Sequence, residues 1–533
     1  MRTQVDVENE PTLPGTSQAR RGFAGAAIGV LAAGVALGTA ELLAAVFGPG
    51  SSPIVAVGGA TVDASPEWLK AFAIRTFGEQ DKLVLLIGIG VVLTAIVAVA
   101  GAASGRRPYL GIAASVALGA VGAAAAVTRP TNDLSDAIPS VVGTVAGVIA
   151  YGRLRDAAGM PSAPPPETHP ASSPTMRSYD RRRFLRAGVA AAGITAVAGG
   201  LGRLLTTRAS AAASRADATI PEPADPLPPP PSGADLGLPG VDPFLTPNAD
   251  FYRVDTALFV PAVDAGSWTL RVHGMVDHEI TLDFDELVAR PMIERDITLA
   301  CVSNEVGGPY VGNARWIGPP LADLLREAGV HPDASQVVSR SVDGFTIGTP
   351  TAVVMDGRDA LLAVSMNGEP LPLEHGFPVR MVVPGLYGYV SATKWLVDLE
   401  LTTLDAYDAY WIQRGWAKEA PIKTQSRIDT PTDGVRLDAG AVAVAGVAWA
   451  QQRGIDRVEV RIDDGPWAQA DLAAEDTIDT WRQWVYRWDA TPGSHALAVR
   501  ATDGEGETQT SELVPPFPDG ATGHHTIQVE VSS

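Results

Sequence analysis

Cysteine is almost absent from this chain of 533 residues, which contains only Cys301. One cysteine cannot form an internal disulfide or supply the ligands of a cysteine-rich zinc or iron–sulfur site, so those classes of protein are excluded. Histidine and methionine are missing between residues 2 and 159, and no haem motif occurs elsewhere. Because a membrane haem needs such side chains as axial ligands, the sequence predicts no haem.

The chain is short of positive charge, with 40 basic against 60 acidic residues and a formal net charge of −20. The deficit lies in residues 211–533, which hold 22 basic and 47 acidic side chains, whereas residues 1–210 hold 18 and 13. Binding to nucleic acid depends on neutralising phosphates with lysine and arginine, so we exclude nucleic acid as a partner.

Four apolar runs fill the first 160 residues, at 22–47, 82–103, 110–127 and 137–151. About 20 apolar residues cross a bilayer as a helix, so residues 1–160 are expected to form a membrane region with about four transmembrane helices, the fourth being short. Arginines before residue 22, at 106–107 and after 152 place those segments in the cytoplasm by the positive-inside rule. Glu41 lies inside the first run, where either a function or a helix contact accounts for it.

Residues 161–210 form a linker that contains the sequence DRRRFLR at 180–186, followed by a weakly apolar Gly/Ala stretch. This pattern resembles a twin-arginine export signal, and a fifth transmembrane helix with a basic flank is the alternative. Either interpretation puts everything after residue 210 outside the cytoplasm, so the protein is expected at the cell membrane with an extracytoplasmic part. Small residues at 209–211 leave cleavage of the fifth apolar segment open.

Two domains are expected after a proline-rich linker at 211–246. Residues 247–425 mix strand-like and helix-like pieces in irregular order, which is typical of an α+β domain. The strand-like pieces are 268–272, 337–340, 379–383 and 395–401, and the helix-like ones are 284–289, 320–328 and 360–364. Residues 430–533 alternate as strands at 443–449, 457–462, 484–488, 495–501 and 526–531, which predicts an immunoglobulin-like β-sandwich.

Cys301 lies where an apolar run meets a glycine-containing loop, in the sequence ITLACVSNEVGG at 297–308. A lone cysteine is often a small buried hydrophobic residue. Its other chemical options are a nucleophile, for which no nearby base is evident, or a soft thiolate ligand to a transition metal.

The segment around Cys301 is similar to the molybdenum-ligand segment of the sulfite oxidase family of molybdopterin enzymes. Further blocks occur in that family's order: NADFYR at 248–253, GNARW at 312–316, MNGEPLP at 366–372, EHGFPVR at 374–380, VPG at 383–385, KWL at 394–396 and PDGATGH at 518–524. The resemblance covers about residues 245–533, so we identify this part of the chain as a relative of the family.

The resemblance implies a molybdenum–molybdopterin cofactor, one metal and one pterin, with Cys301 as the protein's thiolate ligand. Cys301, Arg253 and Arg315 are the candidate catalytic residues, the two arginines as an anion site, and arginine and lysine suit the pterin phosphate because of their donors and charge. The residues implied to hold the cofactor are Tyr252, Arg253, Cys301, Asp343, His375, Arg380, Thr393 and Lys394. A homodimer formed by the C-terminal domain and a separate electron carrier are also implied.

This chain departs from the family at three places. Glu305 and Val306 stand where two arginines are usual, Val364 stands in place of an active-site tyrosine, and Asp255 replaces a histidine. These changes weaken the case for binding a dianion such as sulfite.

The resemblance as a whole implies a membrane-anchored, extracytoplasmic molybdenum oxidoreductase that transfers an oxygen atom to or from a small oxyanion or S-oxide. One alternative is an S-oxide or N-oxide reductase, for instance of methionine sulfoxide, that uses the same site. The other is a membrane-tethered interaction protein without catalysis.

Overall fold

The structure is a computed structural model that describes residues 14–66, 81–104, 109–129, 133–160, 185–193 and 208–532, with single positions at 69, 72–73, 76–77, 107, 182 and 195. The chain divides into two compact units, residues 1–209 with 257–259, and residues 210–256 with 260–533. Most of the expected DRRRFLR motif, including Arg181 and Phe184, lies outside the described residues.

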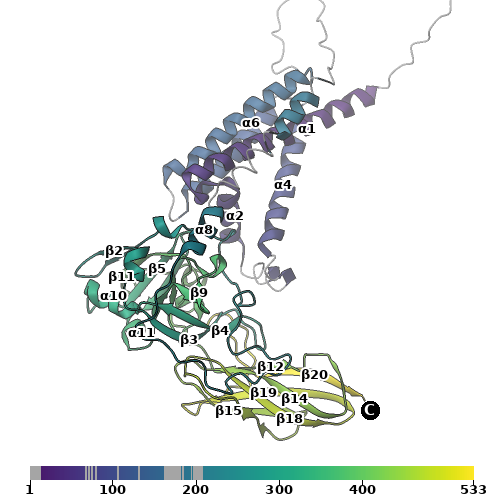
Figure 1. Cartoon of the computed structure of the whole chain (residues 1–533). Helices are drawn as coiled ribbons and strands as arrows, with labels where there is room; N and C mark the ends of the chain where they lie inside the picture. Colours follow the sequence, from purple (N-terminus) through teal and green to yellow (C-terminus); the bar gives the residue numbers. More distant parts are fainter. Residues whose placement is uncertain are drawn as a thin grey trace, which may run out of the picture. The chain divides into compact units, whose positions relative to one another are not determined.

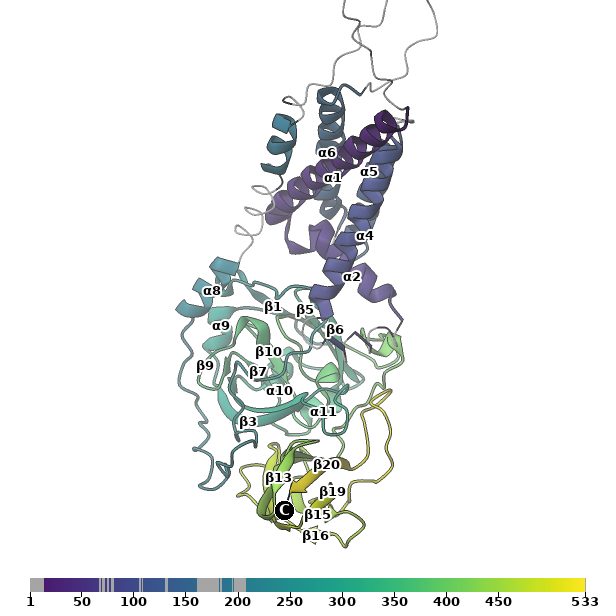
Figure 2. The same cartoon turned by 90° about the vertical axis from the view of Figure 1, so that its right-hand side faces the viewer.

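Four helices of the first unit are long and apolar enough to cross a membrane. They are α1 (Pro14–Phe47), α4 (Asp81–Ala103), α5 (Tyr109–Val127) and α6 (Ile138–Ala157), and the shorter α2 (Pro53–Ala64) follows the turn η1 (Pro49–Ser51). Figure 2 shows them as the purple to blue bundle. A Cβ on Gly25 of α1 would lie 2.3 Å from the carbonyl oxygen of Gly101 on α4, so glycine permits this close packing. The fourth helix continues six residues beyond the expected end at 151.

Glu41 and Arg155 of this bundle have hydrogen-bond partners. The Ser52 hydroxyl, at the N-cap of α2, donates to Glu41 Oε1 at 2.7 Å. Arg155 is 3% exposed and donates to the Ser104 hydroxyl at 3.1 Å. The contact of Glu41 with Ser52 favours a helix contact over a separate function for this carboxylate.

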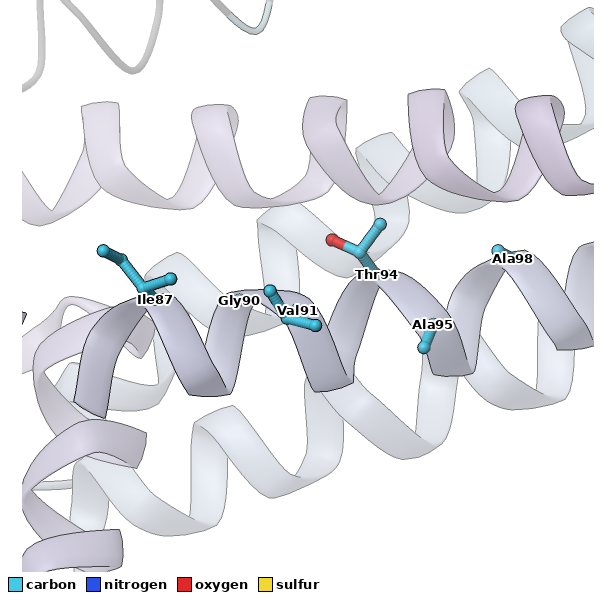
Figure 3. A pocket seen from close by; sticks show the side chains of 6 residues that line it. All are labelled: Ile87, Gly90, Val91, Thr94, Ala95 and Ala98. Atoms are coloured by element: carbon cyan, nitrogen blue, oxygen red, sulfur yellow. The ribbon is translucent and has the colours of Figure 1, made fainter. Parts of the chain in front are cut away.

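One face of α4 carries a hollow of about 500 Å³ (Figure 3). Its lining residues are Ile87, Gly90, Val91, Thr94, Ala95 and Ala98. The lining offers one hydroxyl group and no charge, which suits contact with hydrocarbon.

The central domain, residues 247–424, contains two main sheets and irregularly placed short helices, as expected for an α+β domain (Figure 1). One sheet has the order β2-β1-β11-β5-β6, the second has the order β3-β4-β8-β9, and β10 pairs with β7. The strands are β1 (Thr269–Gly274), β2 (Ile280–Asp283), β3 (Ile293–Ala300), β4 (Val311–Gly318), β5 (Gln336–Ser341), β6 (Thr346–Pro350), β7 (Leu361–Ala363), β8 (Ser365–Met366), β9 (Glu369–Pro370), β10 (Arg380–Val382) and β11 (Leu396–Thr402). The helices are α9 (Phe284–Val288), α10 (Leu321–Ala328) and α11 (Thr351–Met355), and α8 (Arg208–Asp217) precedes the domain.

The spacing of apolar residues explains helix α10, but it led to a wrong prediction for strand β7. In α10, leucines at 321, 324 and 325 and Ala328 bury one face at spacings of three and four, and Gly329 ends the helix with φ 70°. The helix expected at 360–364 is wrong, because Leu361–Ala363 is the fully buried strand β7. A short, uniformly apolar run does not distinguish a buried strand from a helix.

The C-terminal β-domain, residues 425–532, consists of two sheets that share one hydrophobic core. Val444 and Trp484 of the sheet β12-β14-β18-β17 meet Val458, Val499 and Ile527 of the sheet β13-β20-β19-β15-β16. The strands are β12 (Gln425–Thr430), β13 (Arg436–Asp438), β14 (Gly440–Trp449), β15 (Ile455–Ile462), β16 (Ala468–Gln469), β17 (Asp471–Leu472), β18 (Arg482–Ala490), β19 (Gly493–Asp503) and β20 (His525–Ser532). The five expected strands are confirmed, and the short β12, β13, β16 and β17 were missed.

The β-domain forms hydrogen bonds with strand β3 of the central domain. The Trp481 backbone N–H donates to the Thr298 hydroxyl at 2.7 Å, the Thr298 N–H donates to the Asp479 carbonyl at 2.9 Å, and Gln451 donates to the Thr298 carbonyl at 2.9 Å. Trp449 and Trp481 belong to the hydrophobic core of the central domain. The strand that ends at Ala300 is therefore fixed by both domains.

Asp476 at this junction is expected to destabilise the fold at neutral pH. Burial, with the neighbouring Asp296, raises its pKa from 3.8 to about 6, and its Oδ2 has no hydrogen-bond partner among the described residues. The folded state binds the proton of the Asp476 carboxyl group more tightly than the unfolded state does. The free energy of unfolding therefore falls as pH rises from 4 to 6 and stays lower above pH 6.

We expect Asp476→Asn to raise the free energy of unfolding by about 1 kcal/mol at pH 7. This value is converted from the pKa shift of Asp476 and reduced because the carboxyl group is partly exposed to solvent. At pH 4 the gain should vanish. Denaturant unfolding followed by tryptophan fluorescence measures it, since ten of eleven tryptophans follow residue 267. An equal gain at both pH values would contradict this explanation.

Candidate active site

Cys301 directly follows β3 and opens a tightly bonded loop to β4, residues 301–310, which we term the Cys301 loop. The Cys301 N–H donates to the Tyr310 carbonyl at 2.9 Å, and the Asn304 N–H donates to the Cys301 carbonyl at 3.0 Å. The Tyr310 N–H donates to Asn304 Oδ1 at 2.8 Å. These three bonds fix the direction in which the cysteine leaves the strand.

The thiol of Cys301 lies 2.9 Å from the Ser303 hydroxyl. Burial raises the pKa of Cys301, while the Ser303 hydrogen bond and the charge of Lys394 act in the opposite direction. Burial, and next the charge on Cys301, raise the pKa of Tyr252, so this phenol stays protonated close to the sulfur. In the part of the chain that the structure describes, no group of three His, Cys, Asp or Glu side chains forms a metal site.

His375 belongs to a basic cluster with Arg253, Arg380 and Lys394, in which Arg253 is half-buried and the other three are buried. Burial, followed by the charges of Lys394 and Arg380, lowers the pKa of His375 to about 3, so its ring is neutral. Its Nε2 lies 3.0 Å from the Asn248 carbonyl, which places the ring hydrogen on Nε2. Its Nδ1 is a buried acceptor without a partner in the described structure.

Arg380 and Lys394 carry charge into the protein interior. Arg380 is 5% exposed, its Nε has no hydrogen-bond partner among the described residues, and its guanidinium carbon lies 5.3 Å from the centre of the Trp316 ring. Burial lowers the pKa of Arg380 to about 10 and that of Lys394 to about 8. Buried cations and unpaired polar atoms call for an anion with donors and acceptors, so these residues fit the phosphate-bearing pterin.

Asp255 completes the cluster, and sequence reasoning treated it only as a departure from the family. Its side chain is 6% exposed, and its Oδ2 accepts from Arg253 Nε at 2.9 Å and from Lys394 Nζ at 3.0 Å. An acidic residue two positions after Arg253 was the only signal. Asn248 was also missed as a single residue, although it lies in the NADFYR block; its amide donates to Glu369 at 2.6 Å.

Thr393 and Asp343 have local partners. The hydroxyl of Thr393 lies 2.5 Å from that of Ser339, and Asp343 caps the turn between β5 and β6 by accepting from the Phe345 N–H at 3.2 Å. The Val342 N–H donates to the Trp395 carbonyl at 3.0 Å, so the turn of Asp343 lies beside the segment that carries Lys394.

Arg315 lies apart from the basic cluster. Its Nε and Nη2 donate to the two carboxylate oxygens of Asp296 at 2.8 and 2.7 Å, and Nη2 also donates to the Pro228 carbonyl at 3.0 Å. The next residue, Trp316, contacts Arg380, and side chains alternate between the faces of a strand. The structure therefore does not bring Arg315 together with Arg253.

Comparison with known proteins places this arrangement in a family. The model of the oxidoreductase molybdopterin binding domain matches residues 257–411. Sulfite oxidase of Gallus gallus is 30% identical over 322 residues, which cover 51% of this chain and 69% of that protein. This chain belongs to the sulfite oxidase family of molybdenum-dependent oxidoreductases. The family predicted from the sequence is confirmed, and so is the enzyme class, which sets aside the interpretation without catalysis.

Three further proteins are similar to parts of this chain. Mitochondrial sulfite oxidase of Rattus norvegicus is 31% identical over 51% of this chain, and this chain spans 58% of that protein's length. The uncharacterised oxidoreductase YuiH of Bacillus subtilis is 35% identical over 29% of this chain and 74% of its own. The crystal structure of sulfane dehydrogenase SoxCD from Paracoccus pantotrophus is 23% identical, covers 55% of this chain and 82% of its own, and has a TM-score of 0.49.

Proposed function

We propose that this chain is a membrane-anchored, extracytoplasmic oxidoreductase that transfers an oxygen atom, with Cys301 as the molybdenum ligand and the basic cluster as the pterin site. The observation that carries this proposal is the pair Arg380 and His375, which are buried with unpaired polar atoms. When bound, the cofactor supplies the redox chemistry of molybdenum and its exchange of oxygen.

Each residue of the cluster has a distinct role in this proposal. Arg380 offers a planar fork of donors to the phosphate, and Lys394 offers a point charge. Asp255 holds Lys394 and Arg253 in place through the two bonds at 3.0 and 2.9 Å. His375 accepts a hydrogen bond at Nδ1, and the protonated Tyr252 donates one.

Anchoring to the membrane is supported by the four apolar helices and by α8. Ala211, inside the small-residue segment 209–211, is fully buried in the first turn of α8. Arg215 of α8 donates to the carbonyl groups of Pro370 and Leu371 at 2.8 Å each. Cleavage at 209–211 would have to open this helix, so we propose that the fifth apolar segment is retained. The β-domain is proposed to be immunoglobulin-like and to form a homodimer, and electrons pass to or from a separate carrier.

The charges near Cys301 favour an uncharged S-oxide or N-oxide over sulfite as the substrate. Arg253 is already paired with Asp255 and Arg315 with Asp296, and Glu305 is exposed on the Cys301 loop. A dianion needs a net positive surrounding. Reduction of an S-oxide consumes two electrons and two protons and releases water.

The wild-type protein, made in a host that synthesises molybdopterin, is expected to contain about one molybdenum atom per chain by elemental analysis. With reduced dye, kcat/KM for methionine sulfoxide should exceed that for sulfite with oxidised dye by at least about tenfold, a difference of about 1.4 kcal/mol. A folded, exported protein without molybdenum would overturn the proposed function. Faster turnover of sulfite would overturn only the choice of substrate.

A further inference from the structure

Two side chains of the β-domain contact the Cys301 loop. Arg427 of β12 donates from Nη1 to the Gly308 carbonyl at 3.1 Å, across 119 residues of sequence. The ring of His525 on β20 packs on Gly307, where an added Cβ would lie 2.2 Å from His525 Cδ2. Gly307 also has φ 78°, so both its backbone and its surroundings require glycine.

Two carboxylates fix the side chain of Arg427 in the orientation in which it contacts the Cys301 loop. Its side chain is 8% exposed, and it donates to Asp429 Oδ1 and to Asp242 Oδ2, each at 2.5 Å. Burial by itself would lower the pKa of Arg427, but the two carboxylates outweigh burial and raise it. With its charge neutralised in this way, Arg427 is unsuited to hold a substrate anion. Its remaining contact, with Gly308, positions the backbone.

His525 presents a neutral ring to the loop. Burial, and next the charge of Arg427, lower its pKa to about 4. The Ile428 N–H donates to Nδ1 at 3.0 Å, which places the ring hydrogen on Nε2 and fixes the plane of the ring. A flat ring fixed in this way supports Gly307 from one side, while Arg427 holds Gly308 next to it.

The loop transmits this support to the cysteine. The Gly308 N–H donates to the Glu305 carbonyl at 2.8 Å, and the Asn304 N–H donates to the Cys301 carbonyl at 3.0 Å. Asn304 Oδ1 in turn accepts from the Tyr310 N–H at 2.8 Å. A displacement at Gly307 or Gly308 is therefore passed through two hydrogen-bonded turns to Cys301.

We propose that Arg427 and His525 are positioning residues of the active site, through which the β-domain sets the direction of the Cys301 thiol. The proposal rests on the proposed function in taking Cys301 as the metal ligand. The β-domain thus takes part in forming the site, in addition to any role in dimerisation. Because misplacement of a reacting group by about 1 Å can cost about 100-fold in rate, loss of either contact should be measurable.

Hydrogen–deuterium exchange of the full-length protein tests the proposal without turnover. In Arg427→Gln and in His525→Ala, the amides of Cys301, Asn304 and Tyr310 should exchange at least about tenfold faster, which is about 1.4 kcal/mol of lost protection. Strands β18 and β19 should keep the exchange rates of the wild type. His525→Phe, which keeps a flat ring, should restore most of the protection. Arg457→Gln is the matched control, because Arg457 of β15 has a side chain that is 43% exposed and pairs with Glu459 at 3.7 Å.

Activity and spectroscopy separate positioning from general stability. Both variants should lower kcat by at least tenfold with little change in KM, and should shift the electron paramagnetic resonance spectrum of Mo(V). Unchanged exchange in the loop of His525→Ala would overturn the proposal, and so would faster exchange throughout the β-domain. Wild-type protein without molybdenum would instead overturn the role of Cys301, while exchange in the loop would still report on positioning.

Discussion

Cys301→Ser should contain less than a tenth of the wild-type molybdenum and should lower kcat for the preferred substrate at least about 100-fold. The soft thiolate binds a transition metal far better than a serine hydroxyl, which does not ionise near neutral pH. No other described side chains form a protein metal site that would replace it. Elemental analysis and dye-linked assays on the same preparations measure both quantities.

Serine differs from cysteine by one atom, so Cys301→Ser should fold normally and keep the unfolding temperature of the cofactor-free wild type. Ser303→Ala is the matched control, since it removes only the hydroxyl that lies 2.9 Å from the sulfur. This control should retain molybdenum and most of the turnover. Full molybdenum content together with wild-type kcat in Cys301→Ser would show that the sulfur is not the ligand.

The parts of the fold that the sequence predicts are those whose patterns are local. The apolar runs of α1, α4 and α5 and the alternating strands β14, β15, β18, β19 and β20 repeat over many residues, and each is present as expected. The strand β7 was predicted to be a helix because three buried residues, Leu361–Ala363, hold too little periodicity. Its pairing with β10 decides the matter, and such a partner is invisible in the sequence of the segment itself.

The candidate site also has residues that local sequence patterns predict and residues that they do not. Cys301, Arg380 and Lys394 are predicted because each lies in a recognisable sequence block. The role of Asp255 depends on a bond of 3.0 Å to Lys394, which lies 139 residues away, and no local pattern predicts it. Arg315 lies in an equally recognisable block, yet its partner Asp296 turns it away from the cluster. Residue type and spacing therefore predict which side chains are available, and only the packing determines which of them meet.

Arg380→Met should distinguish a role in cofactor binding from a role in stability. We expect the substitution to raise the stability of the cofactor-free protein and to lower its content of pterin. In the wild type without cofactor, Arg380 is a buried charge that forms no ion pair with a carboxylate among the described residues, and burial lowers its pKa from 12.5 to about 10. Folding therefore disfavours the charged form at every pH below about 10, and this cost disappears only as pH rises above that value. Methionine fills similar space without the charge.

We expect the cofactor-free Arg380→Met protein to be more stable than the cofactor-free wild type by about 1 kcal/mol, after the lost contact with the Trp316 ring is subtracted. In a host that makes molybdopterin, the same variant should contain less than a tenth of the wild-type pterin. Arg326→Met, which removes an exposed pair with Asp323 at 2.6 Å on α10, should change neither quantity. If the cofactor-free variant instead unfolds more easily than the wild type, Arg380 supports the fold itself and the basic cluster is not a site prepared for an anion.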